Sequence, residues 1–181
     1  LREDDDRVMG SVMKHRWAYA NTKTLDEFLA LAYWNEFQLP VVIVRLFNTV
    51  GPRQMGMYGM VIPSFVQSAL AGKPIRVFGD GKQTRAYTYI RDVVEATILA
   101  GTKTLPQGKN EIINIGTDED TSVIEIAQLI DGDIEHVYPN PRGLFEEKRK
   151  SADYSKAKSL LGWEPKVSFQ NGFEITYSST N

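Results

Sequence analysis

The sequence contains no cysteine and only two histidines, His15 and His136, in 181 residues. The lack of cysteine excludes disulfide bonds and thiolate metal ligands, and two histidines far apart in the chain argue against a zinc site. No apolar run approaches the roughly 18 residues that a membrane-spanning helix needs. Residues 1–7 are acidic and lack the pattern of a secretory signal peptide. These absences are typical of a cytoplasmic protein, and we expect that location.

Charge is nearly balanced, with 21 Lys and Arg against 23 Asp and Glu and a formal net charge of −2. This balance gives no general electrostatic attraction to nucleic acid or to an anionic membrane, so neither is expected as a partner. The hydrophobic share of 42% is ordinary for a globular protein, and the length corresponds to one domain or slightly more.

Segments with strand and helix periodicity alternate along the chain, which predicts an α/β architecture with parallel pairing. Ligands of such folds bind beyond the carboxyl ends of the strands. Residues 48–59 and 139–152 are interpreted as loops, and Ser122 with Glu125 has the spacing of a capping box. We expect helices at 20–37, 61–72, 92–101, from Thr121 or Ser122 to about 130, at about 154–162 and near the C-terminus, and strands at 41–47, 75–78, 86–90, 111–115 and 134–138.

Tyr19 and Lys23 are four residues apart at the start of a helical pattern, so one helical turn brings them onto the same face. A cation beside a phenol favours its anionic form, and such a pair suits hydride chemistry on an alcohol, where a proton leaves with the hydride. Tyr154 and Lys158 have the same spacing. For that second pair we expect only a residue at a helix start and a solvated lysine, a structural interpretation that is also open for the first pair.

Two further segments carry candidate binding groups. Asn48 follows an apolar strand, and its amide suits a sugar hydroxyl or a diphosphate oxygen; the alternative is an asparagine that stabilises its own turn. Arg85 lies in the glycine-containing run 77–89 and has the fork geometry that grips phosphate, while Phe78 would lie under a base. A hairpin with a solvated turn fits that run as well.

Together these segments resemble the NAD-dependent epimerase/dehydratase family, the extended short-chain dehydrogenases that modify nucleotide sugars. The family motifs occur in the family's order and spacing over nearly the whole chain. They are Tyr19-Ala-Asn-Thr-Lys23, Arg45-Leu-Phe-Asn48-Thr-Val-Gly-Pro52, Phe78-Gly-Asp-Gly-Lys-Gln-Thr-Arg85, Asp92-Val-Val-Glu-Ala96, Asn114-Ile-Gly116 and Asp153-Tyr-Ser-Lys-Ala-Lys-Ser-Leu-Leu-Gly-Trp163.

The resemblance implies a role for each matching residue. Tyr19 is similar to the acid/base that takes the proton of the sugar 4-hydroxyl, and Lys23 to the residue that lowers the tyrosine pKa and holds the nicotinamide ribose of NAD. The remaining matches are to residues that bind the nucleotide or its diphosphate. These are Asn48, Arg85, Tyr87 or Phe78 near the nucleotide, and an arginine before the Asp153 motif for which Arg149 and Arg142 compete, with Arg149 preferred.

The sequence also departs from the family pattern. It lacks the Gly-rich fingerprint that holds the pyrophosphate of NAD, and Ser11 is the only hydroxyl residue before Tyr19, too close for the family's catalytic Ser or Thr. We therefore expect the C-terminal part of a family member, incomplete and inactive in isolation, with a partial Rossmann-like parallel sheet and a smaller substrate-binding domain. The expected division is 1–52 and 84–117 for the dinucleotide-binding domain and 53–83 and 118–181 for the substrate domain.

The family implies an NAD-dependent isomerase or lyase that transiently oxidises carbon 4 of a nucleotide sugar. The motifs are most similar to those of UDP-glucose 4-epimerases and UDP-glucuronate decarboxylases. The alternatives are a nucleotide-sugar-binding module and a self-associating fragment, both without catalysis. A homo-oligomer is expected, formed through the helix at 20–37 or through uncovered strand edges.

Overall fold

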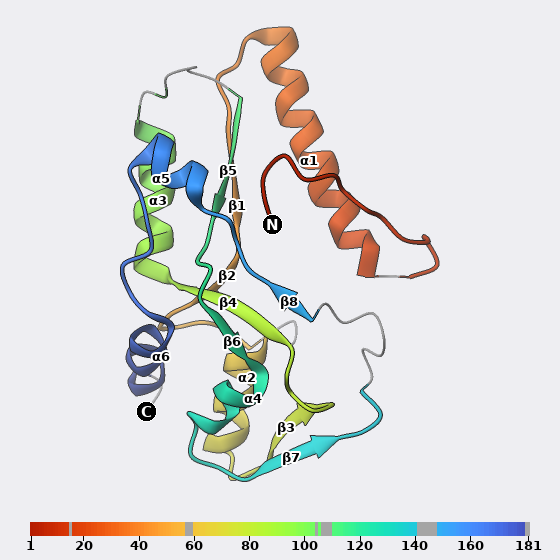
Figure 1. Cartoon of the computed structure of the whole chain (residues 1–181), viewed down its shortest axis with the longest axis vertical. Helices are drawn as coiled ribbons and strands as arrows, with labels where there is room; N and C mark the ends of the chain where they lie inside the picture. Colours follow the sequence, from red (N-terminus) through yellow and green to blue (C-terminus); the bar gives the residue numbers. More distant parts are fainter. Residues whose placement is uncertain (15, 57–59, 104, 106–109, 141–147, 180–181) are drawn as a thin grey trace.

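The computed structural model describes residues 1–14, 16–56, 60–103, 105, 110–140 and 148–179. It confirms the expected mixed α/β fold with parallel strand pairs. Figure 1 shows two lobes, which we call the upper and the lower lobe. The upper lobe holds α1, α3, α5, β1 and β5, and the lower lobe holds α2, α4, α6, β3 and β7, with β2, β4, β6 and β8 at the junction.

The upper lobe is built on two parallel strands, β1 (Val42–Leu46) and β5 (Glu111–Ile115), paired residue by residue along their length. Helix α3 (Ile90–Thr102) packs along β1, and α5 (Ser155–Leu161) packs along β5 and against α3. Their apolar faces close over the β-branched side chains of the strands, as in a parallel sheet. The resulting upper core consists of Val93, Ala96, Ala100, Leu105, Ile113, Ile115, Ala157, Leu161 and Trp163.

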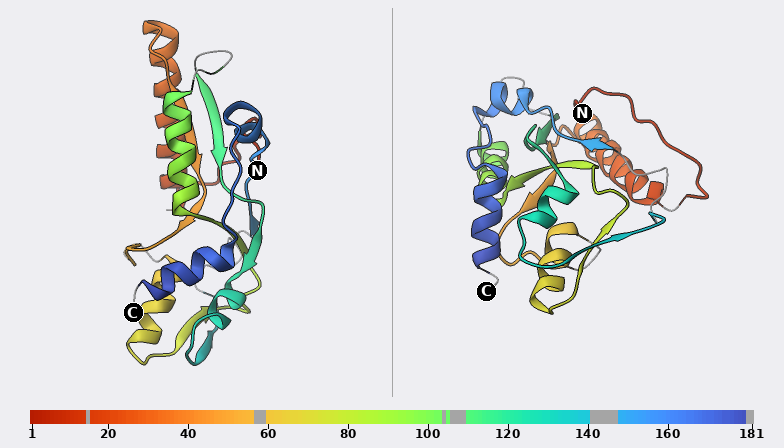
Figure 2. Two further views of the ribbon diagram at one scale, coloured as in Figure 1. Left: turned by 90° about the vertical axis from the view of Figure 1, so that its left-hand side faces the viewer. Right: turned by 60° about the horizontal axis from the view of Figure 1, so that its bottom comes forward.

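The lower lobe packs three helices against short strands. Helices α2 (Val61–Leu70) and α4 (Val123–Gln128) lie against β3 (Ile75–Phe78), which pairs in parallel with β7 (Ile134–Val137), and α6 (Phe169–Ser178) lies against β4 (Thr84–Tyr89). Figure 2 shows α6 lying across this lobe near α2. The lower core consists of Val50, Ile62, Phe65, Val66, Ile75, Val77, Tyr87, Val123, Ile126, Ala127, Ile130, Phe169 and Phe173.

Strand β4 joins the lobes, because it runs directly into α3 and pairs with three other strands. It is parallel to β2 (Asn48–Val50) and β8 (Arg149–Lys150) and antiparallel to β6 (Asp120–Ser122). These three partners have only two or three residues each, so they carry no periodicity of their own. The expected loops at 48–59 and 139–152 were therefore wrong for β2 and β8, which exist through pairing with β4.

The longer elements and one cap follow the sequence pattern closely. Every helix and strand expected from periodicity is present, with ends that differ by a few residues. Ser122 and Glu125 form the expected capping box: the Glu125 amide donates to Ser122 Oγ at 3.2 Å, and the Ser122 amide donates to Glu125 Oε2 at 2.7 Å. Among the described residues, no helix combines the length and apolarity required to cross a membrane.

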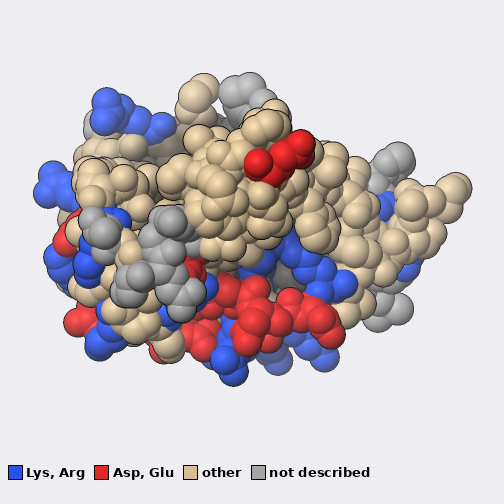
Figure 3. All heavy atoms as spheres, turned by 90° about the horizontal axis from the view of Figure 1, so that it is seen from above, with Lys and Arg blue, Asp and Glu red and all other residues tan. Residues whose placement is uncertain are grey.

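Helix α1 (Arg16–Phe37) stands beside the upper lobe (Figure 1) and contributes no residue to either core. Several of its large apolar side chains are at least half exposed: Leu25, Phe28, Leu29, Tyr33 and Phe37. The face of the molecule seen in Figure 3 likewise has a broad area with few charged residues, bordered below by interleaved acidic and basic side chains. An apolar stripe of this size is typical of an interaction surface.

Candidate active site

A cleft of about 800 Å³ opens between the two lobes. Its walls come from segments distant in sequence: the N-terminal residues, the first turn of α1, the ends of β1 and β5, the start of α2, and strands β2, β4 and β8. The position agrees with the rule that ligands of α/β proteins bind beyond the carboxyl ends of the parallel strands.

The floor of the cleft is a polar platform whose residues are fixed by strand register. Asn48 of β2 lies directly opposite Tyr87 of β4, and Arg85 of β4 lies opposite Lys150 of β8. Residues two apart in a strand share a face, and so do directly opposed residues of neighbouring strands. The four side chains therefore share one face of the sheet, and all four line the cleft. We call them the polar platform: Asn48, Arg85, Tyr87 and Lys150.

Three of the platform side chains are held in place by contacts with the surrounding protein. Asn48 Nδ2 donates to the carbonyl oxygen of Ala86 at 3.3 Å, so its amide bonds across the sheet and not to its own turn. Tyr87 is buried, and its ring centroid is 5.4 Å from that of Phe169 in the lower core. Arg85 Nη1 donates to the carbonyl oxygen of Thr84 at 2.6 Å. The platform is thus a supported surface that presents an amide, a phenol and two cations.

Tyr19 faces this platform from α1. Its side chain is 73% exposed and lines the cleft. Lys23 lies one turn later, with its ammonium 5.9 Å from the centroid of the Tyr19 ring. That ammonium donates to Asp26 Oδ2 at 2.7 Å, which raises the pKa of Lys23, and it does not itself line the cleft. The geometry brings Tyr19 and Lys23 together, while their chemical roles remain predictions.

The second tyrosine–lysine pair is structural. Tyr154 begins α5, and its ring packs edge-on against Trp163 of the upper core, with 6.4 Å between the ring centroids. Lys158 donates to Glu164 Oε2 at 2.5 Å at the surface. Neither residue lines the cleft, whereas Tyr19 of the first pair does, so equal spacing in the sequence leads to different surroundings in α1 and α5.

Two of the expected binding residues do not line the cleft, and a third is not described. Phe78 ends β3 opposite Val137 and does not line the cleft. Arg149 donates to Asp120 Oδ2, away from the cleft, whereas its neighbour Lys150 lines it. Arg142 lies outside the described residues. Successive residues of a strand point to opposite faces, so the register of β8 selects Lys150 for the cleft.

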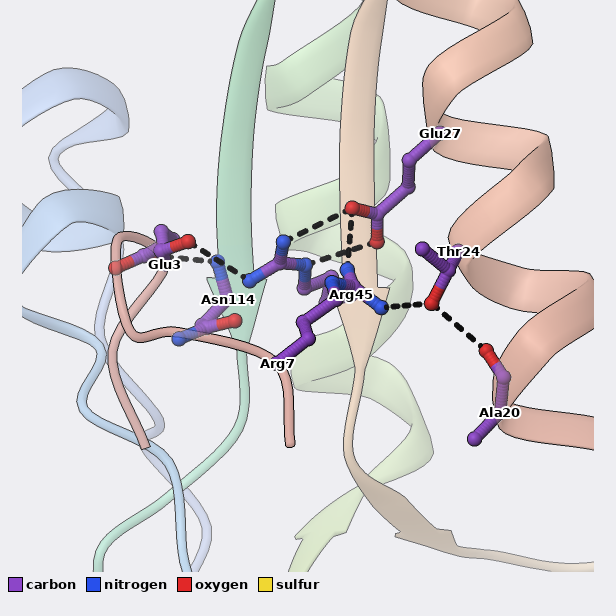
Figure 4. A network of polar contacts seen from close by, with 7 residues as sticks. All are labelled: Glu3, Arg7, Ala20, Thr24, Glu27, Arg45 and Asn114. Carbon is purple, nitrogen blue, oxygen red and sulfur yellow. Dashed lines mark hydrogen bonds and ion pairs between the residues drawn. The ribbon is translucent and has the colours of Figure 1, made fainter. Parts of the chain in front are cut away.

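The sequence did not predict an ionic network centred on Glu27 of α1, which Figure 4 shows. Glu27 of α1 accepts two hydrogen bonds of 2.9 Å from Arg45 of β1, Nε to Oε1 and Nη2 to Oε2. Arg7 of the N-terminal segment donates to Glu27 Oε2 and, through Nη1, to Thr24 Oγ1 at 2.9 Å. A signal existed in the sequence, since Arg45 interrupts an otherwise apolar strand.

The network continues from Arg45 into the N-terminal segment and β5. Arg45 Nη1 donates to the carbonyl oxygen of Glu3 at 3.1 Å, and the backbone amide of Asn114 donates to Glu3 Oε1 at 2.8 Å. Burial alone would raise the pKa of Glu27, but the hydrogen bonds and charges of Arg45 and Arg7 outweigh it and hold that pKa below its ordinary value. The hydrogen bonds that Arg45 donates to Glu27 in turn stabilise its charged form and raise the pKa of Arg45.

Replacing Glu27 by glutamine is expected to destabilise the protein by about 1–3 kcal/mol at pH 7, because two guanidinium groups lose their carboxylate. The folded-state pKa of Glu27 is lowered, so its contribution is complete above the unfolded value of about 4.3 and disappears as the pH falls through the folded value. Urea unfolding from pH 7 to 3 measures this. The difference should shrink with acidity, and a difference that is constant with pH would contradict it; Glu36→Gln on the exposed side of α1 is the control.

No group of three or more acidic or histidine side chains in the described ranges is arranged to hold a metal ion.

Comparison with known proteins decides the family. A sequence model of the NAD dependent epimerase/dehydratase family matches residues 2–116, well over half of the chain. This chain belongs to that family. Among curated relatives of this epimerase/dehydratase, the UDP-N-acetyl-alpha-D-glucosaminuronate decarboxylase of Bacillus cytotoxicus is 42% identical over 96% of the chain and 56% of the relative. UDP-glucuronic acid decarboxylase 2 of Arabidopsis thaliana is 34% identical over 88% of the chain and 36% of the relative.

Solved structures agree. The UDP-glucuronic acid 4-epimerase of Bacillus cereus, solved with UDP-glucuronic acid and NAD, matches with a TM-score of 0.78 and 34% identity over 89% of the chain and 51% of that protein. The chain thus spans about half the length of the relatives it resembles. The homologues are UDP-sugar decarboxylases and epimerases, and the family is NAD-dependent.

The residues of this epimerase/dehydratase chain fit one side of an NAD site. Tyr19 lines the cleft, and Lys23, which is bound to Asp26, lies beside its ring one helical turn away; a phenol and an ammonium are groups that suit a reacting hydroxyl and the nicotinamide ribose. The sequence contains no Gly-Xaa-Gly-Xaa-Xaa-Gly run of the kind that cradles a dinucleotide pyrophosphate. The fit therefore covers the reacting end of the cofactor.

Proposed function

We propose that this chain forms the sugar-nucleotide side of an NAD-dependent UDP-sugar decarboxylase or epimerase and supplies its acid/base tyrosine. The observation that supports this proposal is the shared cleft: Tyr19 from α1 and the four polar-platform residues line the same cavity. A sugar nucleotide needs a cationic floor for its diphosphate and a proton acceptor near the sugar, and these groups meet both requirements.

In this proposal the platform binds the diphosphate. Arg85 and Lys150 supply two adjacent positive charges, and Asn48 adds an amide donor beside them. Tyr87, whose ring is fixed against Phe169, lies where the nucleoside would begin. Lys150 takes the part that the sequence motif suggested for Arg149, because Arg149 is engaged with Asp120. The sugar then extends from the platform toward Tyr19.

Tyr19 acts on the sugar 4-hydroxyl. Its oxygen, as phenolate, takes the hydroxyl proton while the hydrogen on carbon 4 leaves as hydride, so that carbon 4 becomes a ketone. The ammonium of Lys23 lies 5.9 Å from the centroid of the Tyr19 ring, one helical turn along α1. NAD, when bound, supplies the hydride acceptor. In a uronic acid the new ketone is β to the carboxylate, so the bond between carbons 5 and 6 can break to release carbon dioxide; its electron pair forms an enolate with the ketone, and carbon 5 then takes up a proton. In an epimerase the hydride returns to the opposite face of carbon 4.

The apolar outer face of α1 is the basis for the oligomeric state that we propose. Leu25, Phe28, Leu29 and Tyr33 are half exposed or more, and burying them against a second copy would remove a large apolar surface from water. We propose a homo-oligomer formed through this face, which leaves the cleft-facing residue Tyr19 at the border of the contact.

The test is calorimetric titration of the chain with UDP-glucuronic acid and, separately, with NAD. Binding of the sugar nucleotide is expected, weakened about tenfold by Arg85→Ala and by Lys150→Ala because each removes one charge-assisted contact. Tyr19→Phe should retain the affinity. The matched control is Arg76→Ala, an exposed arginine of β3 outside the cleft. No measurable binding, or equal binding by Arg85→Ala, would contradict the proposal.

A second measurement separates an enzyme from a binding module without catalysis. The chain is supplied with NAD and UDP-glucuronic acid, and carbon dioxide and the epimer at carbon 4 are measured. An enzyme forms one of these products, and Tyr19→Phe abolishes its formation while leaving sugar-nucleotide binding intact. Binding without any product is the result expected both of the module and of an enzyme part that is inactive in isolation, so only product formation that depends on Tyr19 separates the two.

A further inference from the structure

Helix α1 carries Tyr19, yet apolar packing does little to hold it. None of the described side chains of α1 is buried, and neither core includes any of them. Within this chain, burial of an amphipathic face, the usual source of a fixed helix position, therefore contributes little to holding α1. Some other interaction has to set where Tyr19 lies relative to the polar platform.

The Glu27 network is the strongest attachment on the inner face of α1. Tyr19, Lys23 and Glu27 follow one another at intervals of four residues, so they form one row along the helix. The Glu27 side chain is only 15% exposed, against 60% for Asp26, which pairs with Lys23 at the surface. Its two-point bond to Arg45 fixes both distance and rotation of the helix relative to β1, because a bidentate guanidinium–carboxylate pair is planar.

Arg7 adds a third attachment to the same carboxylate. Its guanidinium spans Glu27 and Thr24, and Thr24 Oγ1 bonds back to the carbonyl oxygen of Ala20, next to Tyr19. Figure 4 shows these contacts running from β1 to the first turns of α1. Arg7 and Arg45 themselves line the cleft. One carboxylate thus connects strand, N-terminal segment and helix about two helical turns from the proposed acid/base.

We infer that Glu27 is a positioning residue that holds Tyr19 over the polar platform through Arg45 and Arg7. The part concerning catalysis rests on the proposed function, since it assigns Glu27 a role in the reaction of Tyr19. The part concerning helix position does not, because it follows from the contacts of α1 alone. The two parts can be tested separately.

The helix position is tested by distance measurement across the cleft. The chain lacks cysteine, so Asn21→Cys on α1 and Ser64→Cys on α2 allow two spin labels, read by double electron–electron resonance without any ligand. One narrow distribution of the distance between the labels is expected in the chain that carries only these two substitutions. Adding Glu27→Gln or Arg45→Gln should broaden it, and adding Glu36→Gln should leave it unchanged. A narrow, unshifted distribution in both network variants would overturn the inference.

The catalytic part is tested by tyrosine resonances labelled with carbon-13. UDP-glucuronic acid at saturation is expected to shift the signals of both Tyr87 and Tyr19 in the unaltered chain. In Glu27→Gln the Tyr87 shift should persist and the Tyr19 shift should be lost, with Glu27→Asp restoring part of it. General unfolding would remove both shifts. If Tyr19 responds normally in Glu27→Gln, its positioning does not depend on the network; if neither tyrosine responds in the unaltered chain, the proposed function fails and the distance test still stands.

Discussion

Trp163→Ala is expected to lower the free energy of unfolding by about 3–5 kcal/mol, the range for removing a buried aromatic side chain. Trp163 is 1% exposed and is the largest fully buried side chain of the described residues. It lies after α5 in the upper core, where it fills the space between α3, α5 and β5. Truncation to a methyl group would leave a cavity that surrounding helices and strands cannot close without losing their own contacts.

A polar contact adds to this cost. Trp163 Nε1 donates to the carbonyl oxygen of Asp92 at 2.9 Å, and the carboxylate of Asp92 accepts the amides of Lys166 and Val167, also at 2.9 Å. The indole therefore ties the start of α3 to the chain segment that leads into α6. Without it, the buried Asp92 carbonyl loses this donor.

Urea unfolding of Trp163→Ala, Trp163→Phe and Ile98→Ala measures the effect. Trp163→Phe keeps most of the packing and loses the indole donor, so it should fall between the alanine variant and the unaltered chain. Ile98 is 58% exposed on the outer side of α3, and Ile98→Ala should change stability by less than about 0.5 kcal/mol. A loss below about 1 kcal/mol in Trp163→Ala would mean that the upper core does not depend on this side chain.

Gly81→Ala is expected to cost about 2–5 kcal/mol, and Gly72→Ala only about 1–2 kcal/mol. Both glycines have a positive φ, +71° and +63°, which disfavours any L side chain. They differ in the space around them. A Cβ at Gly81 would lie 2.8 Å from Val77 Cγ1 and 2.9 Å from Ile124 Cβ, whereas nothing lies within 4 Å of the same atom at Gly72. The difference between the two variants isolates the steric part.

The clash that Gly81→Ala would create is also expected to affect the cleft. The carbonyl oxygen of Gly81 accepts the amide of Ile124, and that of Gln83 accepts the amide of Val123, so this turn holds the start of α4 beside β4. Displacing it would move the beginning of β4, where Arg85 lies. We therefore expect Gly81→Ala to weaken UDP-glucuronic acid binding as well as stability, measured by urea unfolding and by calorimetry at a temperature where the variant is folded. Equal stability of the two glycine variants would contradict the steric argument.

Periodicity and family motifs predicted much of this structure, because both reflect local chemistry. The long helices and the apolar strands repeat their burial pattern over many residues, and the capping box of Ser122 needs only four. The motif positions of Tyr19, Asn48, Arg85 and Tyr87 likewise lead to one cleft. These are cases in which a residue's neighbours in sequence also determine its surroundings in the fold.

The remaining features depend on pairing between distant segments. Strand β8 has two residues, and only its register with β4 determines that Lys150 and not Arg149 points into the cleft. The network around Glu27 joins residues 18 and 20 positions apart, so no local pattern reveals it. A charged residue within an apolar strand, as at Arg45, signals that a partner exists without identifying it.

The residues of the two cores alternate along the sequence, and this order has a consequence for biosynthesis. The lower core takes residues from 50–87, then 123–130, then 169–173, and the upper core takes residues from 93–115 and 157–163 in between. A ribosome that adds residues from the N-terminus therefore cannot complete one core before it starts the other. Both remain open until Trp163 and Phe173 have emerged, so the nascent chain displays unfinished apolar surface until translation of this region is nearly over.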